Sequence, residues 1–242
     1  DRRGTERRDQ ALMARRVFVA GAAGAIGMPL CRLLVADGWN VFGTTRRVAK
    51  IGLLGDIGVA PVVVDVFDAE ALKRSLADVA PDIVVHQLTD LPPGLDPAKM
   101  AEARARNARL RDEGTRNLIA AALAAGATRI VAQSIAFAYA PGPKPLKETA
   151  ALDPMQLGAI SLERQVLAGP MAGVVLRYGR LYGPGTGFAE NKPAPLHVDA
   201  AADAARRALN RGQGAYNIAE DDGEVDSSRA KADLGWSADF RL

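Results

Sequence analysis

The sequence predicts an α/β fold built on a doubly wound parallel sheet. Strand-like apolar runs alternate with stretches of helical apolar spacing along the chain, as happens when helices cover both faces of a parallel sheet. The run at residues 82–88 has a continuous apolar core, as expected of a strand buried on both faces. The 242 residues are 48% hydrophobic and 24% charged, which is typical of a globular domain with a sizeable core.

Residues 1–16 differ in composition from the rest of the chain, with six arginines against three acidic residues. They contain no apolar segment of the kind found in secretory signals. We therefore expect residues 1–14 to be a flexible leader and residues 15–242 to form the folded domain. Because this stretch accounts for much of the net charge of +3, we expect no nucleic-acid partner. No apolar run is long enough to suggest a membrane span.

The cysteine and histidine contents limit the chemistry of the protein. The single cysteine, Cys31, excludes an internal disulfide and fits a cytoplasmic location. His86 and His197 are the only histidines, and no cysteine cluster replaces a histidine-rich site, so we expect no metal site.

A glycine-rich turn joins the first predicted strand, residues 17–20, to the first helix, residues 28–36. The first glycine permits a tight turn, the second lets a diphosphate approach the backbone, and the third lets the helix pack close to the strand. The helix start then presents free N–H groups to the anion. A glycine-rich turn without a ligand is the alternative. We expect the cofactor diphosphate to bind at Gly21, Gly24, Ala25, Ile26 and Gly27.

The second predicted strand, residues 41–44, indicates which cofactor binds. In dinucleotide-binding folds an acidic residue after this strand binds the ribose 2′-hydroxyl, whereas an arginine accommodates a 2′-phosphate. Arg46 and Arg47 stand there, and no Asp or Glu lies between Gly38 and Lys50. The sequence therefore predicts NADP rather than NAD, with NAD as the second possibility; the alternative is that the two arginines are solvated and bind no cofactor.

The remaining elements follow in alternation. Strands are predicted at residues 60–66, 82–88, 129–134, 173–177 and 215–219. Asp68 is a plausible N-cap for a helix after the first of these strands. A long helix is predicted at residues 98–125, with a kink near Gly114. Two further helices are expected at residues 157–168 and between His197 and Leu209.

Several of these motifs resemble the extended and atypical short-chain dehydrogenase/reductase superfamily, the group of nucleotide-sugar epimerases and dehydratases. The motifs are the Gly-x-x-Gly-x-x-Gly spacing, the turn at residues 176–185, and the segments at 197–209, 216–219 and 234–236. The resemblance covers about residues 15–242. It implies a Rossmann-type sheet with a small C-terminal substrate lobe, formed by residues 179–200 and 220–242. The connection at residues 185–196 is much shorter than the lobe of a sugar epimerase.

The resemblance also implies further cofactor contacts and a partner. Asp65 and Val66 match the position that meets the adenine, although Asp65 also precedes a helix start. His86 and Leu88 lie where the family passes its backbone near the cofactor ribose and diphosphate. A single histidine at that place is more often structural than catalytic. Residues 114–118 resemble the family's fourth helix, which commonly packs against a second subunit and implies a homodimer; the helices at residues 98–125 and 157–168 would form its interface.

The family's catalytic pair is missing from this sequence. Its helix carries Tyr-x-x-x-Lys, in which the lysine lies one turn from the tyrosine, on the same face, and lowers the tyrosine pKa. Leu157 stands at the tyrosine position and Ser161 at the lysine position, while Gly158 and Leu162-Glu163 keep the frame. A leucine transfers no proton, and a serine brings no positive charge.

Three hydroxyl-bearing residues remain as candidates for contact with a substrate. Ser134 lies beside the family's catalytic position after the fifth strand, and a role as a backbone cap is equally consistent with its place. Tyr139 and Tyr178 are phenols near the expected cleft. Neither has a lysine four residues later, because Pro143 and Tyr182 stand there.

The sequence thus predicts an NAD(P)-binding protein that resembles NAD-dependent epimerase/dehydratases. As an enzyme it would be an oxidoreductase, epimerase or dehydratase acting on a small carbonyl or sugar-like substrate, with NADP preferred. The loss of the Tyr–Lys pair leaves open whether it turns over substrate. A cofactor-sensing or regulatory binding protein without activity is the alternative, and a structural subunit is a third possibility.

Overall fold

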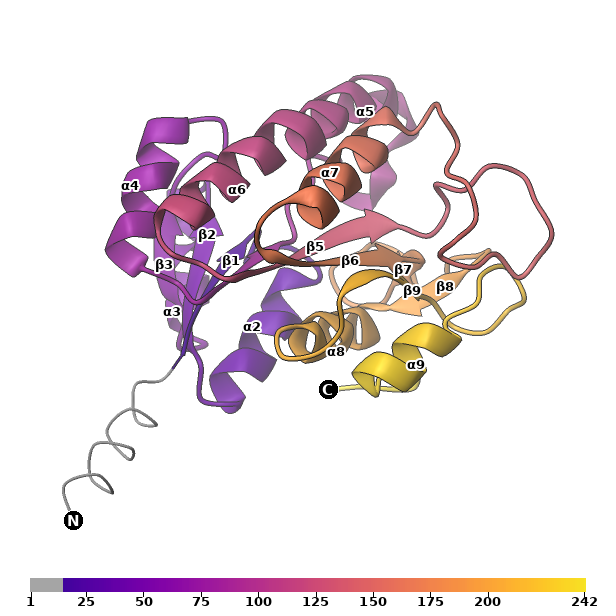
Figure 1. Cartoon of the computed structure of the whole chain (residues 1–242). Helices are drawn as coiled ribbons and strands as arrows, with labels where there is room; N and C mark the ends of the chain where they lie inside the picture. Colours follow the sequence, from indigo (N-terminus) through magenta and orange to yellow (C-terminus); the bar gives the residue numbers. More distant parts are fainter. Residues whose placement is uncertain (1–14) are drawn as a thin grey trace, which may run out of the picture.

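The computed structural model describes residues 15–242, apart from the side chain of Pro93 (Figure 1). The predicted leader at residues 1–14 lies outside the described residues. Seven parallel strands form the central sheet, in the order β3-β2-β1-β4-β5-β6-β9, which confirms the predicted doubly wound α/β fold. The strands are β1 (Arg16–Ala20), β2 (Asn40–Thr45), β3 (Ala60–Val63), β4 (Ile83–His86), β5 (Arg129–Ile135), β6 (Ala172–Tyr178) and β9 (Gly214–Ile218).

The order of the strands places a crevice at one edge of the sheet. The chain moves outward from β1 to β3 and then returns to β4 on the other side of β1, so the winding reverses between β1 and β4. At such a switch point the connections leave in opposite directions, and a crevice opens outside the carboxyl ends of the strands.

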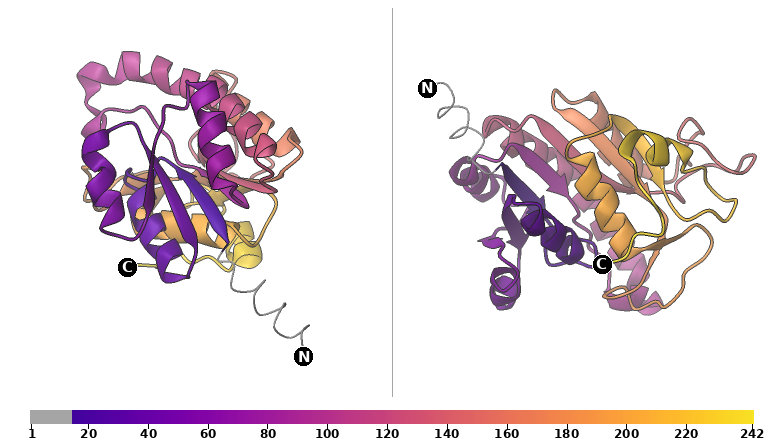
Figure 2. Two further views of the ribbon diagram at one scale, coloured as in Figure 1. Left: turned by 90° about the vertical axis from the view of Figure 1, so that its left-hand side faces the viewer. Right: turned by 90° about the horizontal axis from the view of Figure 1, so that it is seen from below.

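Helices cover both faces of the sheet (Figure 2). One face carries α2 (Gly27–Ala36), α3 (Ile51–Gly55), α8 (Val198–Ala208) and α9 (Ser228–Leu234). The other carries α4 (Ala69–Val79), α5 (Met100–Arg109), α6 (Thr115–Ala124) and α7 (Leu157–Ala168). Asp68 caps α4 as expected, because its Oδ1 accepts a hydrogen bond from the Ala71 N–H at 2.9 Å.

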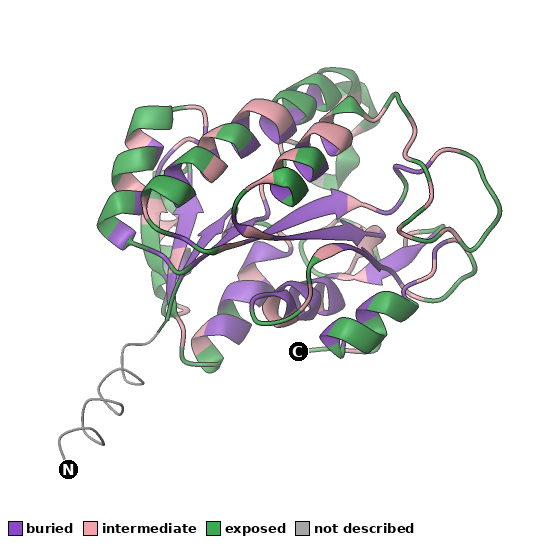
Figure 3. Ribbon diagram, viewed as in Figure 1, coloured by how far each residue is buried: buried purple, intermediate pink, exposed green. Residues whose placement is uncertain are grey.

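The alternation of side chains along β1 explains the continuous apolar run of the sequence. Val17 and Val19 belong to the core beneath α2 and α8, whereas Phe18 and Ala20 belong to the core beneath α4 and α6. All four are buried, so the strand has no solvated face. The helices are buried toward the sheet and exposed on their outer sides (Figure 3).

The long helix predicted at residues 98–125 is divided by a π-helical turn. Two short 3₁₀ turns, η2 (Pro93–Leu95) and η3 (Pro97–Lys99), precede α5, and the π turn η4 (Leu110–Gly114) joins α5 to α6. A β-carbon on Gly114 would lie 3.0 Å from Val66 Cγ1, so the helix packs closely here. A π turn holds one more residue than an α turn and thereby changes which side chains face inward. Leu110 and Arg111 are both buried in it.

The third strand is shorter than predicted, because the ladder ends at Val63 rather than Val66. Asp65 Oδ1 accepts a hydrogen bond from the Phe67 N–H at 3.0 Å, which is a local turn that competes with strand pairing. The turn leaves Asp65 and Val66 in the crevice at the carboxyl end of β3.

Two loops cover the crevice. A two-stranded sheet, β7 (Arg180–Tyr182) and β8 (Pro195–His197), lies beyond β6 within the predicted lobe segment 179–200. The loop between these strands approaches the glycine turn, since a β-carbon on Gly185 would lie 3.6 Å from Ala25 Cα. It also meets the loop before α5, where a β-carbon on Gly187 would lie 3.1 Å from Gly94 Cα.

Candidate functional site

A cavity of about 540 Å³ lies at the carboxyl ends of the strands. The glycine turn, the ends of β2, β4, β5 and β6, and the two covering loops form its wall. Its volume lies within the usual range of ligand sites, and its position matches the crevice that the strand order predicts.

The glycine turn at residues 21–27, called the glycine cradle below, is closely packed because two of its three glycines have no room for a side chain. Gly21 has φ +90°, and a β-carbon there would lie 2.7 Å from the Gln87 carbonyl oxygen. A β-carbon on Gly27 would collide with the carbonyl oxygens of Gly21 and Ala22, so only glycine lets α2 start this close to β1. A β-carbon on Gly24 meets only one atom within 4 Å, Gly21 O at 3.3 Å.

Several backbone donors in this turn have no acceptor within residues 15–242, among them those of Ala25 and Ile26. Both residues line the cavity together with Gly21 and Gly24. Free N–H groups at a helix start, aligned with the helix dipole, attract a phosphate. Gly27 itself is not on the wall and serves the packing of α2.

The end of β2 is basic, as the sequence predicts. Arg46, Arg47 and Lys50 all line the cavity. The Arg46 guanidinium lies 4.0 Å from the Asp65 carboxylate and 3.8 Å from that of Asp90, which are long, half-exposed ion pairs. Sequence reasoning missed Lys50, whose Nζ donates to the Ala23 carbonyl oxygen at 3.0 Å. Its place three residues after Arg47 was the available signal.

His86 is fully buried and does not line the cavity, whereas Leu88 does. The Nδ1 atom of His86 accepts a hydrogen bond from the Leu88 N–H at 3.3 Å, so the proton of the neutral imidazole is on Nε2. Nε2 lies 3.1 Å from Thr115 Oγ1. Burial and the nearby Arg111 lower the pKa of His86 to about 4. The side chain therefore serves as a neutral support beneath the site.

Ser134 lines the cavity but is held by a buried carboxylate. Its Oγ donates to Glu163 Oε1 at 2.6 Å. The Arg177 guanidinium binds the same carboxylate twice, at 3.0 Å from Nε to Oε1 and 2.7 Å from Nη2 to Oε2. The side chains of Glu163 and Arg177 are only 5% and 6% exposed. Sequence reasoning missed this pair, since neither residue shows by its spacing that it is buried.

The two candidate phenols are both engaged. The Tyr139 hydroxyl donates to Asn217 Oδ1 at 2.6 Å and accepts from Arg177 Nη1 at 2.8 Å, and Tyr139 is not on the cavity wall. Tyr178 does line the cavity, but its hydroxyl donates to the Ala201 carbonyl oxygen at 3.3 Å and accepts from Gln87 Nε2 at 3.2 Å. Burial raises the pKa of both hydroxyls, which makes them poor acids.

Phenylalanine at position 139 is expected to lower the free energy of unfolding by about 1–3 kcal/mol, because the buried Asn217 and Arg177 each lose a partner. The same change at Tyr178 breaks longer bonds and is expected to cost less. Urea unfolding of both variants would check the order, and equal losses would contradict it.

The residues at the positions of the missing catalytic pair face away from the cavity. Leu157 is 71% exposed, and Ser161 donates from its Oγ to Asp112 Oδ1 at 2.5 Å. Neither belongs to the cavity wall. Helix α7 therefore contributes to the site through Glu163 beneath it and offers no group for proton transfer at either position.

Three further residues of the wall were missed by sequence reasoning: Arg111, Phe137 and Arg180. Arg111 is 8% exposed, and within the part of the chain that the structure describes it has no hydrogen bond or ion pair. The Arg180 guanidinium lies over the Phe137 ring, 4.6 Å from its centroid. The sequence indicated only a kink near Arg111, and nothing in the local sequence indicated the stacked pair.

Within residues 15–242, no group of three or more His, Cys, Asp and Glu side chains is placed to hold a metal ion. In the same part of the chain, every helix is too short or too polar to cross a membrane.

Comparison with known proteins places these features in context. A reductase of Streptomyces sp, described as 3-diazoavenalumate denitrifying reductase, is 46% identical over 193 residues. The match covers 76% of this chain and 62% of that protein, so the chain spans about three fifths of the relative.

Solved structures share the fold. The Thermotoga maritima UDP-glucose 4-epimerase with UDP-glucose has a TM-score of 0.80 at 19% identity, with 94% of each chain covered. The Bordetella bronchiseptica enzyme WbmG in complex with NAD has a TM-score of 0.77 at 18% identity, covering 96% of this chain and 91% of the other.

A family model matches most of the described domain. The model is that of the NAD dependent epimerase/dehydratase family. It covers residues 17–215, from β1 to β9. The sheet order and the glycine cradle agree with this match. The chain belongs to the NAD dependent epimerase/dehydratase family.

Proposed function

We propose that the chain is an NADPH-dependent reductase that acts on a small electrophilic substrate. One observation carries this proposal: the glycine cradle and the basic end of β2 open into the same cavity as Ser134 and Tyr178. A dinucleotide held at the cradle would extend from β2 toward β5 and β6. Family membership and the 46% identical reductase support the same reaction class.

The residues present fit such a cofactor. The free N–H groups of Ala25 and Ile26 would hold the diphosphate, and the open side of Gly24 leaves room for it. Gln87 lines the cavity, and its Oε1 is buried without a hydrogen-bond partner within residues 15–242, so it would accept a hydrogen bond from the cofactor. When bound, the nicotinamide supplies a hydride.

The preference for NADP is supported by the charges at the end of β2. Arg46, Arg47 and Lys50 surround the place of the adenosine ribose, and Asp65 is the only acidic side chain on the cavity wall within residues 15–242. The ion pairs of Arg46 are long and half-exposed, so the guanidinium is free to turn toward a 2′-phosphate.

Serine at position 46 is expected to weaken NADPH binding about tenfold or more and to leave NADH binding nearly unchanged. Arg46 would lose a charge-assisted hydrogen bond that only the 2′-phosphate accepts. Titration of purified protein with both nucleotides, followed by fluorescence, measures this. Serine at Arg32, an exposed arginine of α2 away from the cavity, is the matched control. Equal losses for both nucleotides would contradict the assignment.

The side chains of the site limit the substrate. Carbonyl reduction places a proton on the product oxygen, and the family's tyrosine supplies it. Here the phenol of Tyr178 is engaged and has a raised pKa, and α7 brings neither a tyrosine nor a lysine to the wall. The site is therefore better suited to a substrate whose reduction does not require a proton donor at the reacting atom.

A diazo compound, as in the name of the Streptomyces reductase, meets this condition. Hydride addition to the carbon of an aromatic diazonium group forms one C–H bond, breaks the C–N bond and releases N₂. Loss of N₂ drives the reaction, and no proton is needed at the reacting carbon; a substrate that enters as the neutral diazo ketone takes one proton from water on its ring oxygen. We infer that a small aromatic diazo compound belongs to the substrate class of this chain.

Incubation with NADPH and either an aromatic diazo compound or a panel of aldehydes and ketones tests the proposal. We expect NADPH oxidation with N₂ release in the first case. This activity is expected to persist in the Tyr139→Phe and Tyr178→Phe variants. Turnover of carbonyls alone would contradict the substrate class. Cofactor binding with no turnover of any substrate would favour a cofactor-sensing protein instead.

We also propose that the protein is a homodimer in the cytoplasm. The helices α6 and α7 carry the exposed leucines Leu123, Leu157 and Leu167. The single cysteine supports a reducing compartment. Light scattering of purified protein measures the mass, and a monomeric mass at micromolar concentration would contradict the dimer.

A further inference from the structure

The cavity carries more positive charge than a dinucleotide requires at its expected position. Within residues 15–242, its wall bears five cationic side chains and one acidic one, Asp65; the cations are Arg46, Arg47, Lys50, Arg111 and Arg180. The first three follow β2, where the adenosine end of the cofactor is expected. The backbone N–H groups of the glycine turn serve the diphosphate. This leaves Arg111 and Arg180 without an anion.

Arg111 is buried at a cost that the nearby Glu163 carboxylate offsets only in part. Its side chain lines the cavity, is 8% exposed, and has an Nε without any partner in residues 15–242. An unpaired charge away from water is strongly unfavourable. The π turn η4 holds it there, since the change in helical register turns this residue inward.

The neighbouring carboxylate does not neutralise Arg111. Both oxygens of Glu163 already accept hydrogen bonds from Arg177, and Oε1 also accepts from Ser134. The pair formed by Glu163 and Arg177 has no net charge. His86 is neutral because burial and the Arg111 charge lower its pKa to about 4. One positive charge therefore remains uncompensated beneath the cavity.

Arg180 provides a second cation beside an aromatic ring. Its guanidinium is stacked 4.6 Å from the Phe137 centroid, its Nε is buried without a hydrogen-bond partner in the described part of the chain, and both residues line the cavity. Stacking fixes the planar group while its N–H edge stays available. The Phe137 ring is 43% exposed and offers an apolar surface to a planar ligand.

We propose that Arg111 and Arg180 bind an anionic group of the substrate, and that this group is the carboxylate of a small aromatic acid. This inference rests on the proposed function and names the substrate class of the same site. A guanidinium matches the two oxygens of a carboxylate with two parallel hydrogen bonds. The connection between β7 and β8 that covers the cavity is short, which favours a small acid over a nucleotide sugar.

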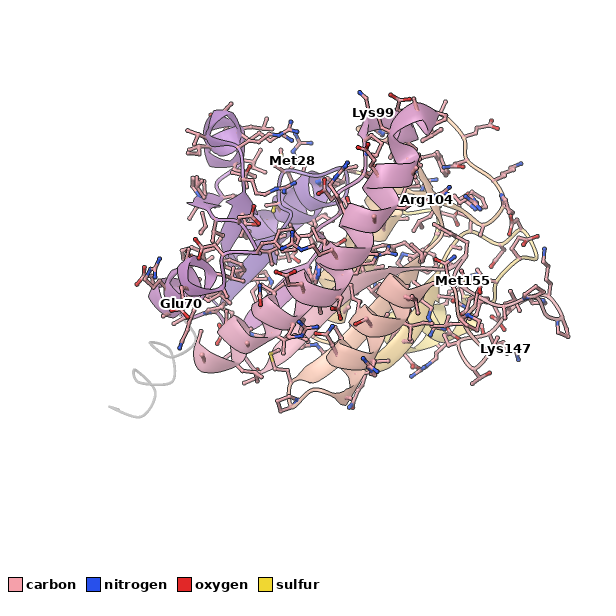
Figure 4. The ribbon with its side chains drawn as sticks, turned by 90° about the horizontal axis from the view of Figure 1, so that it is seen from above. Met28, Glu70, Lys99, Arg104, Lys147 and Met155 are labelled. Atoms are coloured by element: carbon pink, nitrogen blue, oxygen red, sulfur yellow. The ribbon has the colours of Figure 1, made fainter. Side chains whose placement is uncertain are left out.

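Binding of cinnamate and its uncharged amide, cinnamamide, tests the proposal by calorimetry on the NADP⁺-saturated protein. We expect cinnamate to bind about tenfold or more tightly than cinnamamide, as one charge-assisted pair predicts. Arg111→Met is expected to abolish the difference in affinity between cinnamate and cinnamamide, and Arg180→Met is expected to reduce it. Arg104→Met is the matched control, since Arg104 is exposed on α5 outside the cavity wall (Figure 4).

Thermal unfolding supplies a second readout that does not depend on activity. Without ligand, Arg111→Met is expected to raise the melting temperature, because it removes an unpaired buried charge. The gain would be about 2–4 °C for each kcal/mol recovered in a chain of this size. Cinnamate would then stabilise the wild-type protein but not the variant.

Three outcomes would overturn the proposal. Equal binding of cinnamate and cinnamamide would exclude recognition of the carboxylate. Binding of UDP-glucose that is stronger than that of cinnamate, and that is lost in Arg111→Met, would show that the two arginines bind a phosphate. A fall in NADP⁺ affinity in Arg111→Met, without a change in the preference for cinnamate, assigns Arg111 to the cofactor. Failure of the proposed function is distinguishable, because it is seen in the cofactor titration of the wild-type protein.

Discussion

Replacing Glu163 by glutamine is expected to lower the free energy of unfolding by about 3–5 kcal/mol, since removal of one partner of a buried ion pair leaves the other charge uncompensated. The Glu163 carboxylate binds the Arg177 guanidinium at 3.0 and 2.7 Å and accepts from Ser134 Oγ at 2.6 Å. Both charged side chains are nearly inaccessible to water.

The loss is expected to be large because Glu163 is the acidic group between two arginines. Without it, Arg177 would lose its counterion and would be a second buried, uncompensated positive charge beside Arg111. The double variant Glu163→Gln, Arg111→Met is therefore expected to be more stable than Glu163→Gln alone. Denaturant unfolding of the four combinations of these changes measures the coupling.

An exposed ion pair of the same length is the control. Arg109 Nε and Glu113 Oε2 are also 2.7 Å apart, four residues from each other on the surface of the same helical segment. Glutamine at Glu113 is expected to leave the unfolding midpoint within experimental error, because water solvates both groups. Similar losses at positions 113 and 163 would show that burial does not set the strength of the inner pair.

Acidification is expected to destabilise the fold by about 3 kcal/mol through His86 alone. Its pKa in the folded protein is lowered from 6.5 to about 4 by burial and by Arg111. Between these values the unfolded chain binds a proton that the folded protein does not. The contribution of His86 is therefore complete above pH 6.5, falls as the pH falls, and reaches its limit near pH 4.

The prediction is checked by urea unfolding at several pH values between 4 and 7. Glutamine at His86 is expected to flatten this part of the profile, whereas glutamine at His197 would change it less, because His197 is partly exposed and its pKa is lowered less by burial. An unchanged slope for the His86 variant would mean that the ring is protonated in the folded state.

Part of the site was predictable because its signals are local. The three glycines, the arginines after β2 and the absence of acidic residues between Gly38 and Lys50 can be read from adjacent positions. The structure gathers Gly21, Gly24 and Arg46 on one cavity wall. The loss of the Tyr–Lys pair was also visible, since a helix repeats its faces at fixed spacing.

The other part depends on contacts between distant segments. Tyr139 was expected near the substrate, and the structure places it in a buried network with Asn217, which is 78 residues away. Glu163 and Arg177 form a pair whose burial no spacing reveals. The role of Arg111 follows from a π turn that the sequence indicated only as a kink.

By itself, the sequence determined the parallel α/β fold and predicted the glycine turn and the loss of the catalytic pair, because periodicity and turn residues act over a few positions. The tertiary structure alone decided which charges are neutralised. It brings Glu163 of α7 to Arg177 of β6 and leaves Arg111 unpaired at the cavity, because the balance of buried charge depends on which side chains the fold brings together in a medium that excludes water.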